Sequence, residues 1–180
     1  MEPLAPVEVV VATRSDVVDL ADVAARTFPL ACPPRVAPDD VADFIAKNLS
    51  SSRFEDYLGD PDRVVLVARS AGRILGYAML IRGVADDPDV ASAVPLRPAV
   101  ELSKMYVAPE YHGADVSPAL MTGALDSARN LGAMCTWLGV NQENQRAQRF
   151  YAKHGFIVNG TKTFRLGGHV ENDYVMVRTF

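Results

Sequence analysis

The segment that most constrains the fold is residues 106–120, YVAPEYHGADVSPAL, in which an apolar run passes through a short polar turn into a helix start. Ser117 is typical of a helix N-cap, and Pro118 suits the first helical position, where its missing N–H costs nothing. Apolar residues then recur at a helical spacing, at Leu120, Ala124, Leu125 and Ala128. A buried strand leading into a helix N-terminus presents free backbone N–H groups, which favour a phosphate or pyrophosphate. A plain strand–turn–helix connection without a ligand is the alternative.

Length and composition predict a single globular domain over residues 1–180. Of these residues, 49% are hydrophobic, which is sufficient for one sizeable core. The net charge of -4 does not indicate a nucleic-acid partner. No apolar run approaches the about 18 residues of a membrane span, and the N-terminus lacks the basic start of a signal peptide. We therefore expect a cytoplasmic protein with no nucleic-acid partner and no membrane partner.

The cysteines and histidines do not indicate a disulfide or a metal. Cys32 and Cys135 lie far apart in the sequence, and we expect both to be reduced, buried thiols. The histidines show no metal-ligand spacing with cysteines or carboxylates. We therefore expect no metal site.

Apolar and β-branched runs predict strands at residues 7–12, 64–68, 74–81, 99–107, 134–140, 156–164 and 174–179. Helical spacing predicts helices that begin near Ser15, Asp39, Ser117 and Asn141, and residues 54–58 suggest a further short helix. Residues 83–98, rich in aspartate and proline, are expected to form a long loop. Hairpins early and late in the chain, with strand–helix–strand units between them, predict a mixed sheet covered by helices.

A second motif covers residues 138–156, LGVNQENQRAQRFYAKHGF. Asn144 stands at the junction between a predicted strand and a helix, and Phe150 and Tyr151 lie together on the last helical turns. From spacing alone, Asn144 can be a helix cap, Phe150 a core residue, and Tyr151 a half-buried anchor with its hydroxyl in water. Spacing by itself therefore favours structural roles for all three.

Together, the segments ELSKMYVAPEYHG and WLGVNQENQRAQRFYAKHGF resemble the GNAT superfamily of acetyl-coenzyme A-dependent N-acetyltransferases. The residues that match the family's second motif are Asn144, Ala147, Phe150, Tyr151, Lys153, Gly155 and Phe156. The ending GTKTFRLGGHVENDYVMVRTF and the early TFPL are similar to the bacterial PaiA-like spermine/spermidine acetyltransferases. The resemblance implies an α/β (α+β) fold, with a mixed, mostly antiparallel sheet of six to seven strands flanked by about four helices. At its centre we expect a splayed parallel pair, the strands at 99–107 and 134–140.

The resemblance also implies an acyltransferase that moves the acetyl group of its cosubstrate, acetyl-CoA, to a primary amine of a small, polyamine-like acceptor by direct attack. It implies Glu101 as a general base acting through water, and Tyr151 as the general acid that protonates the thiolate. The pantetheine arm is expected to add to the strand at 99–107 through backbone hydrogen bonds of Met105 and Val107. The full set of expected cofactor-binding residues is Met105, Tyr106, Val107, His112, Gly113, Ala114, Asp115, Val116, Ser117, Asn144 and Tyr151. We expect a monomer or a homodimer.

The predicted pyrophosphate turn departs from the family pattern. His112 stands where the family usually has glutamine or arginine, and Asp115 replaces the glycine whose backbone approaches the phosphates. At an effective dielectric of about 20, like charges about 5 Å apart repel by roughly 3 kcal/mol, so a carboxylate there opposes an anionic ligand. Alternatively, Asp115 rotates outward into water, or it caps the helix and fills the anion site with its own carboxylate. The alternative function is a GNAT-fold domain with a degenerate pyrophosphate loop, which binds a ligand or partner without catalysis.

Several acidic residues favour a cationic acceptor such as a polyamine. They are Asp39, Asp40, Asp86, Asp87, Asp89 and Glu101. The alternative is a solvated loop and a helix start that take no part in binding.

Overall fold

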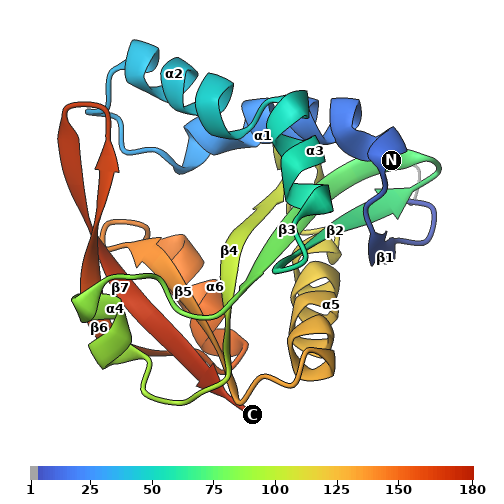
Figure 1. Ribbon diagram of the computed structural model, residues 1–180. Coiled ribbons are helices and arrows are strands. Elements are labelled where there is room, and N and C mark those ends of the chain that lie inside the picture. The colour runs from blue at the N-terminus through green and yellow to red at the C-terminus, as the bar shows by residue number, and fades with distance from the viewer. Residues whose placement is uncertain (1–3) are drawn as a thin grey trace.

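The computed structural model describes residues 4–180, which form one seven-stranded sheet with helices on both faces (Figure 1). The strands are β1 (Glu8–Val11), β2 (Arg63–Ser70), β3 (Arg73–Arg82), β4 (Ala99–Val107), β5 (Cys135–Asn141), β6 (Ile157–Leu166) and β7 (His169–Thr179). Their order across the sheet is β1-β2-β3-β4-β5-β7-β6. Neighbouring strands run antiparallel except for β4 and β5, which are parallel. The predicted mixed sheet with a central parallel pair is therefore confirmed.

The helices are α1 (Val17–Ala31), α2 (Pro38–Asn48), α3 (Ser51–Gly59), α4 (Pro88–Ala93), α5 (Val116–Asn130) and α6 (Gln145–Lys153). The described residues thus contain six α-helices, whereas about four were expected. Part of the difference is α4, which lies inside the predicted loop at residues 83–98. Asp87 caps α4 by accepting a hydrogen bond from the backbone N–H of Asp89, and Pro88 occupies its first turn. A proline that starts a helix was mistaken for one that excludes it.

Three predicted boundaries were wrong. Helix α5 begins at Val116 with Asp115 as its N-cap residue, so Ser117 and Pro118 lie within its first turn. Helix α6 begins at Gln145 because the Asn144 side chain caps it by accepting a hydrogen bond from the Ala147 N–H at 3.1 Å. Strand β7 begins five residues before the predicted position 174, because the chain reverses in a tight hairpin after β6 and keeps pairing up to the turn.

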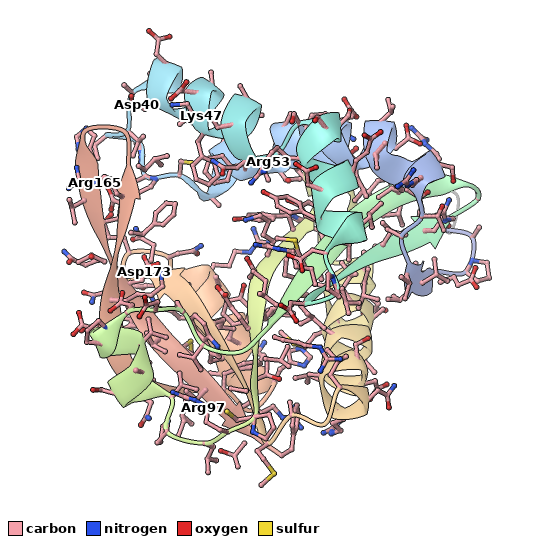
Figure 2. The ribbon with its side chains drawn as sticks, in the orientation of Figure 1. Asp40, Lys47, Arg53, Arg97, Arg165 and Asp173 are labelled. Atoms are coloured by element: carbon pink, nitrogen blue, oxygen red, sulfur yellow. The ribbon has the colours of Figure 1, made fainter. Side chains whose placement is uncertain are left out.

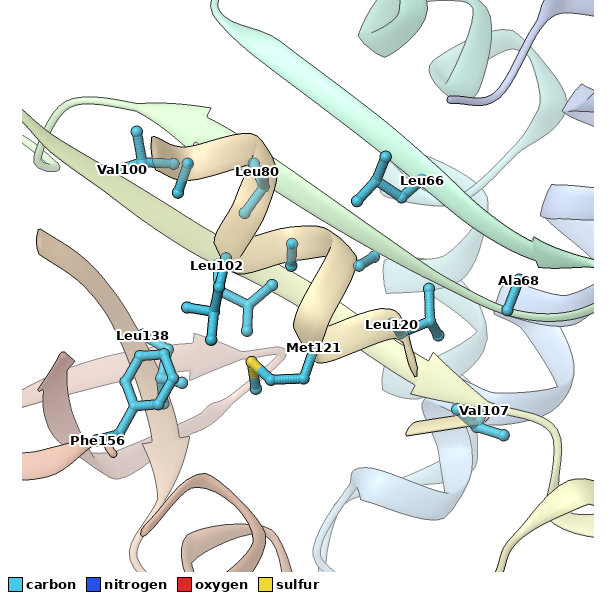
Figure 3. Packing of buried hydrophobic residues seen from close by; sticks show 14 of the residues in the cluster. Leu66, Ala68, Leu80, Val100, Leu102, Val107, Leu120, Met121, Leu138 and Phe156 are labelled. Atoms are coloured by element: carbon cyan, nitrogen blue, oxygen red, sulfur yellow. The ribbon is translucent and has the colours of Figure 1, made fainter. Parts of the chain in front are cut away.

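Two hydrophobic clusters cover the two faces of the β1–β4 half of the sheet. On one face, α5 packs its buried side chains Val116, Leu120, Met121 and Ala124 against β2, β3 and β4 (Figure 3). On the other face, α1 and α3 bury Leu20 and Phe54 against Val67 and Tyr77. Because side chains alternate along each strand, β2 supplies Leu66 to the first cluster and Val67 to the second.

The parallel strands β4 and β5 are paired only at their beginnings. The register joins Ala99 to Cys135, Val100 to Thr136 and Glu101 to Trp137, and then stops. Beyond Glu101, β4 continues to pair with β3, and β5 with β7. A bulge accompanies the separation, since Leu80 pairs with Leu102 and Met79 with Lys104, which leaves Ser103 as the extra residue. The sheet therefore opens at its centre, immediately before α5 begins.

Removing a buried side chain from the core between α5 and the sheet should destabilise the whole fold. Leu120 is fully buried in α5, so Leu120→Ala should lower the free energy of unfolding by about 2–5 kcal/mol. The matched control is Val18→Ala on α1, where the side chain is 68% exposed and the change should stay within about 0.5 kcal/mol. Urea unfolding followed by circular dichroism measures both. Equal stabilities for the two variants would contradict the packing of α5 described above.

Candidate active site

A cleft of about 570 Å³ occupies the gap where β4 and β5 separate. Its walls come from the C-terminal end of α1, from β4 and β5, from α6, and from the β6–β7 hairpin. The predicted site residues that line it are Glu101, Met105, Tyr106, Val107, His112, Gly113, Ser117, Asn144 and Tyr151. Ala114, Asp115 and Val116 are not among the lining residues. The two distant motifs of the sequence therefore meet at one cleft.

The edge of β4 that faces this cleft has backbone groups available for a ligand. The Ala108 N–H donates to the Leu75 carbonyl at 2.9 Å, so Ala108 points toward β3. Because backbone groups alternate in direction along a strand, Val107 and Met105 point toward the opened side. His112 confirms this direction for Val107, since its Nε2 lies 2.9 Å from the Val107 carbonyl oxygen. An extended chain of amides can therefore add to β4 here in the manner of another strand.

The turn before α5 holds Asp115 in a way that the sequence did not predict. Asp115 has a left-handed backbone, with φ of 61°, a conformation that aspartate tolerates better than most residues. Its side chain makes no capping hydrogen bond, is exposed to solvent, and lies outside the cleft wall. Of the alternatives open for this carboxylate, the outward-facing one matches the structure.

Arg146 places a positive charge beside the turn. This residue of α6 lines the cleft, and its Nη2 lies 3.4 Å from Nδ1 of His112. Arginine can only donate, so Nδ1 of His112 accepts, and Nε2 carries the proton that is donated to the Val107 carbonyl. The guanidinium of Arg146 therefore lies beside His112, in the turn that precedes α5. The signal that was overlooked is a basic residue one position before the alanine of the second motif.

Tyr151 is directed at the cleft from the last turns of α6. Its ring packs edge-on against Phe150 and Phe156, at centroid distances of 5.7 and 6.0 Å. Burial raises the pKa of the Tyr151 phenol to about 12, so the hydroxyl stays protonated throughout the neutral range. The charge of Tyr151 also contributes, after burial, to the raised pKa of Tyr106, together with Cys32 and Asp173. Cys32, which follows α1, and residues from α6 and β7 therefore approach Tyr106 of β4.

Glu101 and Lys104 lie on either side of the Ser103 bulge. Burial raises the pKa of the Glu101 carboxyl, and the positive charges of Lys162, Lys104 and Arg63 oppose that shift. Burial lowers the pKa of the Lys104 ammonium, and the charge of Glu101 opposes it. Both residues line the cleft. Glu101 thus combines access to the cleft with a carboxylate that takes up a proton more readily than an exposed one.

The β6–β7 hairpin contributes a pair of charges that sequence analysis missed. Lys162 and Asp173 are cross-strand partners, and their Nζ and Oδ2 atoms lie 3.3 Å apart. Burial raises the pKa of Asp173, Lys162 lowers it, and the charge of Glu171 raises it further. Gly139 of β5 gives the Lys162 chain its room, since a Cβ at this position would collide with Lys162 Cε. The alternation of Lys162, Phe164 and Leu166 along β6 was the sequence signal that these side chains share one face of the strand.

Of the six acidic residues that the sequence analysis connected with a cationic acceptor, Glu101 lines the cleft and the five aspartates lie elsewhere. Asp39, Asp40, Asp86, Asp87 and Asp89 do not line the cleft. Figure 2 shows Asp40 on α2 and Asp173 on the β6–β7 hairpin. The cleft carboxylates are instead Glu101, Glu171 and Asp173.

Two further searches concern metals and membranes. Within residues 4–180, no group of three or more histidine, cysteine or acidic side chains has an arrangement that would hold a metal ion. None of the helices in the same range has the length and apolarity of a membrane-spanning segment.

Comparison with known proteins gives a family and relatives for this chain. The profile of the acetyltransferase (GNAT) family matches residues 24–156. An uncharacterised N-acetyltransferase of Mycobacterium tuberculosis is 61% identical over 164 residues, which cover 91% of this chain and 97% of that protein. Among solved structures, the PaiA N-acetyltransferase of Thermoplasma acidophilum in complex with coenzyme A has a TM-score of 0.76 at 19% identity, covering 97% of this chain and 99% of that one. A chimera of the spermidine N-acetyltransferase from Vibrio cholerae has a TM-score of 0.68 at 19% identity, covering 96% and 95%.

Proposed function

Because the chain belongs to the GNAT acetyltransferase family, we propose that it transfers the acetyl group of acetyl-CoA to a primary amine of a small, polyamine-like acceptor. The observation that carries this proposal is the cleft between the separated strands β4 and β5, in front of the N-terminus of α5. The non-catalytic alternative depended on a carboxylate in the phosphate turn. Asp115 is exposed and lies outside the cleft wall, which favours the catalytic function. The cytoplasmic location and the monomeric or dimeric state stay predictions.

The residues present fit acetyl-CoA. The open edge of β4 offers the N–H and carbonyl of Met105 and the N–H of Val107 to the amides of the pantetheine arm, while the Val107 carbonyl accepts from His112. The turn from His112 to Ser117 and the first N–H groups of α5 suit the pyrophosphate, and Arg146 adds a positive charge next to them. When bound, acetyl-CoA supplies an acetyl thioester whose carbonyl carbon accepts the amine.

In our proposal, Glu101 and Tyr151 carry out the proton transfers of this reaction. Glu101, with its raised pKa, removes a proton from the acceptor ammonium through a water molecule, because only a neutral amine is nucleophilic. Tyr151, which stays protonated in the neutral range, donates its proton to the departing thiolate. Asn144 caps α6 and thereby fixes the helix that carries Tyr151.

The acceptor is proposed to be cationic, because Lys104 and Lys162 offset Glu101 and Asp173 at the cleft wall, whereas Glu171 keeps one buried oxygen without a hydrogen-bond partner among the described residues. The neighbour from Vibrio cholerae is named a spermidine N-acetyltransferase. At 19% identity, its likeness to this chain concerns the fold alone.

Removing the Tyr151 hydroxyl tests the function and the general acid together. Wild-type protein should release CoA from acetyl-CoA in the presence of a polyamine, and Tyr151→Phe should lower kcat by about 100-fold. The affinity for acetyl-CoA should stay within about threefold, since the phenyl ring keeps its packing against Phe150 and Phe156. Thiol release followed with a chromogenic reagent measures kcat. Unchanged turnover in Tyr151→Phe across the pH range would assign the acid elsewhere.

The variant Glu101→Gln tests whether the Glu101 carboxylate serves catalysis or the stability of the fold. The kcat/KM of the wild type should fall as the pH drops through the raised pKa of Glu101, and Glu101→Gln should lower kcat by about 10²- to 10⁴-fold and lose this acid limb. A raised native pKa means that stability is lost as the pH rises from the unfolded to the native pKa. The Tm of Glu101→Gln should therefore exceed that of the wild type above this window and match it below. A lower Tm at neutral pH would show that the carboxylate is structural.

The phosphate turn can be tested with two charge changes. Asp115→Asn should alter the Kd for acetyl-CoA by less than about threefold, because the exposed carboxylate is screened by water and salt. Arg146→Gln should weaken binding by about tenfold, because its guanidinium stands beside the turn. Isothermal titration calorimetry gives both values. A tenfold gain of affinity in Asp115→Asn would mean that the carboxylate faces the phosphates after all.

A further inference from the structure

We propose that Glu171 is the residue that recognises the acceptor, by binding a second, positively charged group that lies away from the reacting amine. The inference rests on the proposed function and assigns the acceptor to amines with two nitrogens separated by an alkyl chain. Glu171 lies on β7, on the wall of the cleft that faces the separated strands. Glu171 lies within the ending GTKTFRLGGHVENDYVMVRTF but was not among the expected site residues.

The β6–β7 hairpin places Glu171 in that wall by simple alternation. Phe164 pairs with Glu171, and Lys162 pairs with Asp173 two residues further along. Residues two apart on a strand share a face, so all four side chains face the cleft, and all four line it. Leu166 continues the same row on β6.

Only one oxygen of the Glu171 carboxylate has partners. Oε2 accepts hydrogen bonds from Nη2 of Arg35 and from Nδ2 of Asn141, the latter at 3.1 Å. Oε1 is buried and has no hydrogen-bond partner among residues 4–180, and the residue as a whole is 2% exposed. A buried carboxylate oxygen without a donor is costly, and an ammonium group is the donor that satisfies it best.

The other cleft carboxylates are already engaged by cations. Asp173 forms its ion pair with Lys162, and the charge of Lys104 acts on Glu101. Arg35 covers Glu171 at Oε2 and also bonds Oε2 of the exposed Glu143 at 2.6 Å. Glu171 is therefore the cleft carboxylate with a buried oxygen that lacks a hydrogen-bond partner among the described residues.

An aromatic wall beside Glu171 suits an alkyl chain between the two nitrogens. Phe28 and Phe44 stack with centroids 4.5 Å apart, and Phe164 meets Phe44 edge-on at 5.9 Å. All three rings line the cleft, and Phe164 is the cross-strand partner of Glu171. Aromatic faces bind methylene groups by apolar contact and attract ammonium groups.

The reaction then balances as follows. The remote nitrogen stays protonated at Glu171, while the reacting nitrogen gives up its proton toward Glu101 through water. A C–N bond forms at the acetyl carbonyl carbon, the C–S bond breaks, and the thiolate takes the proton of Tyr151, while the second proton lost by the acetylated nitrogen returns to the Tyr151 phenolate. A monoamine of equal length reacts at the same place but leaves Oε1 unsatisfied.

The test compares cadaverine with n-pentylamine, which lacks the second amine. Wild-type kcat/KM should favour cadaverine by about 100-fold, and Glu171→Gln should reduce this preference at least tenfold through the KM for cadaverine, with the KM for acetyl-CoA unchanged. Glu143→Gln is the matched control, because it removes the other partner of Arg35 without touching the cleft wall. Its preference should equal that of the wild type. If Glu171→Gln does not fold, Glu171→Asp is used in its place. Aspartate keeps a negative charge for Arg35, and its side chain, shorter by one methylene, moves that charge away from the cleft.

Cadaverine binding to the CoA-saturated protein, measured by calorimetry, separates this inference from the proposed function. The Kd should rise at least tenfold in Glu171→Gln and stay unchanged in Glu143→Gln. If no amine is acetylated but this pattern of binding holds, the proposed function fails and the recognition role stands. An unchanged Kd in Glu171→Gln, or an equal loss of kcat/KM for both amines, overturns the role of Glu171.

Discussion

The short parallel contact between β4 and β5 is the constraint on which the structure depends. After three residue pairs the backbone hydrogen bonds stop, and the sheet continues as two halves, β1–β4 and β5–β7–β6. The halves are held together below the opening by side chains, since Leu102 and Met121 share one cluster with Leu138 and Phe156 (Figure 3). Apolar packing replaces the missing ladder, so the strands can separate above it while the fold stays continuous. The same separation exposes the edge of β4 and opens the cleft.

The opening also explains why so many ionisable groups are buried near it. Glu101, Lys104, Lys162, Glu171 and Asp173 all line the cleft. Isolated charges in such a place would be too costly, and here each acts on a neighbour of opposite sign. Burial is the largest influence on the pKa of Glu101, Lys104 and Asp173, and it moves each toward its neutral form. Perturbed pKa values of this kind are common at functional sites.

The sequence predicted the centre of the fold better than its margins, for physical reasons. Strand β4 was placed at the observed residues because prolines stand just outside both of its ends and most residues between them are apolar. The motif residues Glu101, Asn144 and Tyr151 were brought to one cleft as expected. The predicted start of α5 was wrong because Asp115 adopts a left-handed backbone. Aspartate tolerates this conformation, but no local propensity requires it. Glu171 was missed because its position depends on hairpin register and on Arg35, a residue 136 positions away.

Separate elements surround the two ends of the cleft, and this division has a consequence for specificity. The edge of β4, the turn before α5 and Arg146 lie at one end. Arg35, from the connection between α1 and α2, binds Glu171 of β7 and Glu143 at the start of α6, which ties three segments together at the other end. Asn141 reinforces the tie, because it donates to Glu171 and accepts from the Glu143 N–H at 2.9 Å. Changes in the β6–β7 hairpin or in the α1–α2 connection can thus alter the part of the cleft wall that holds Glu171.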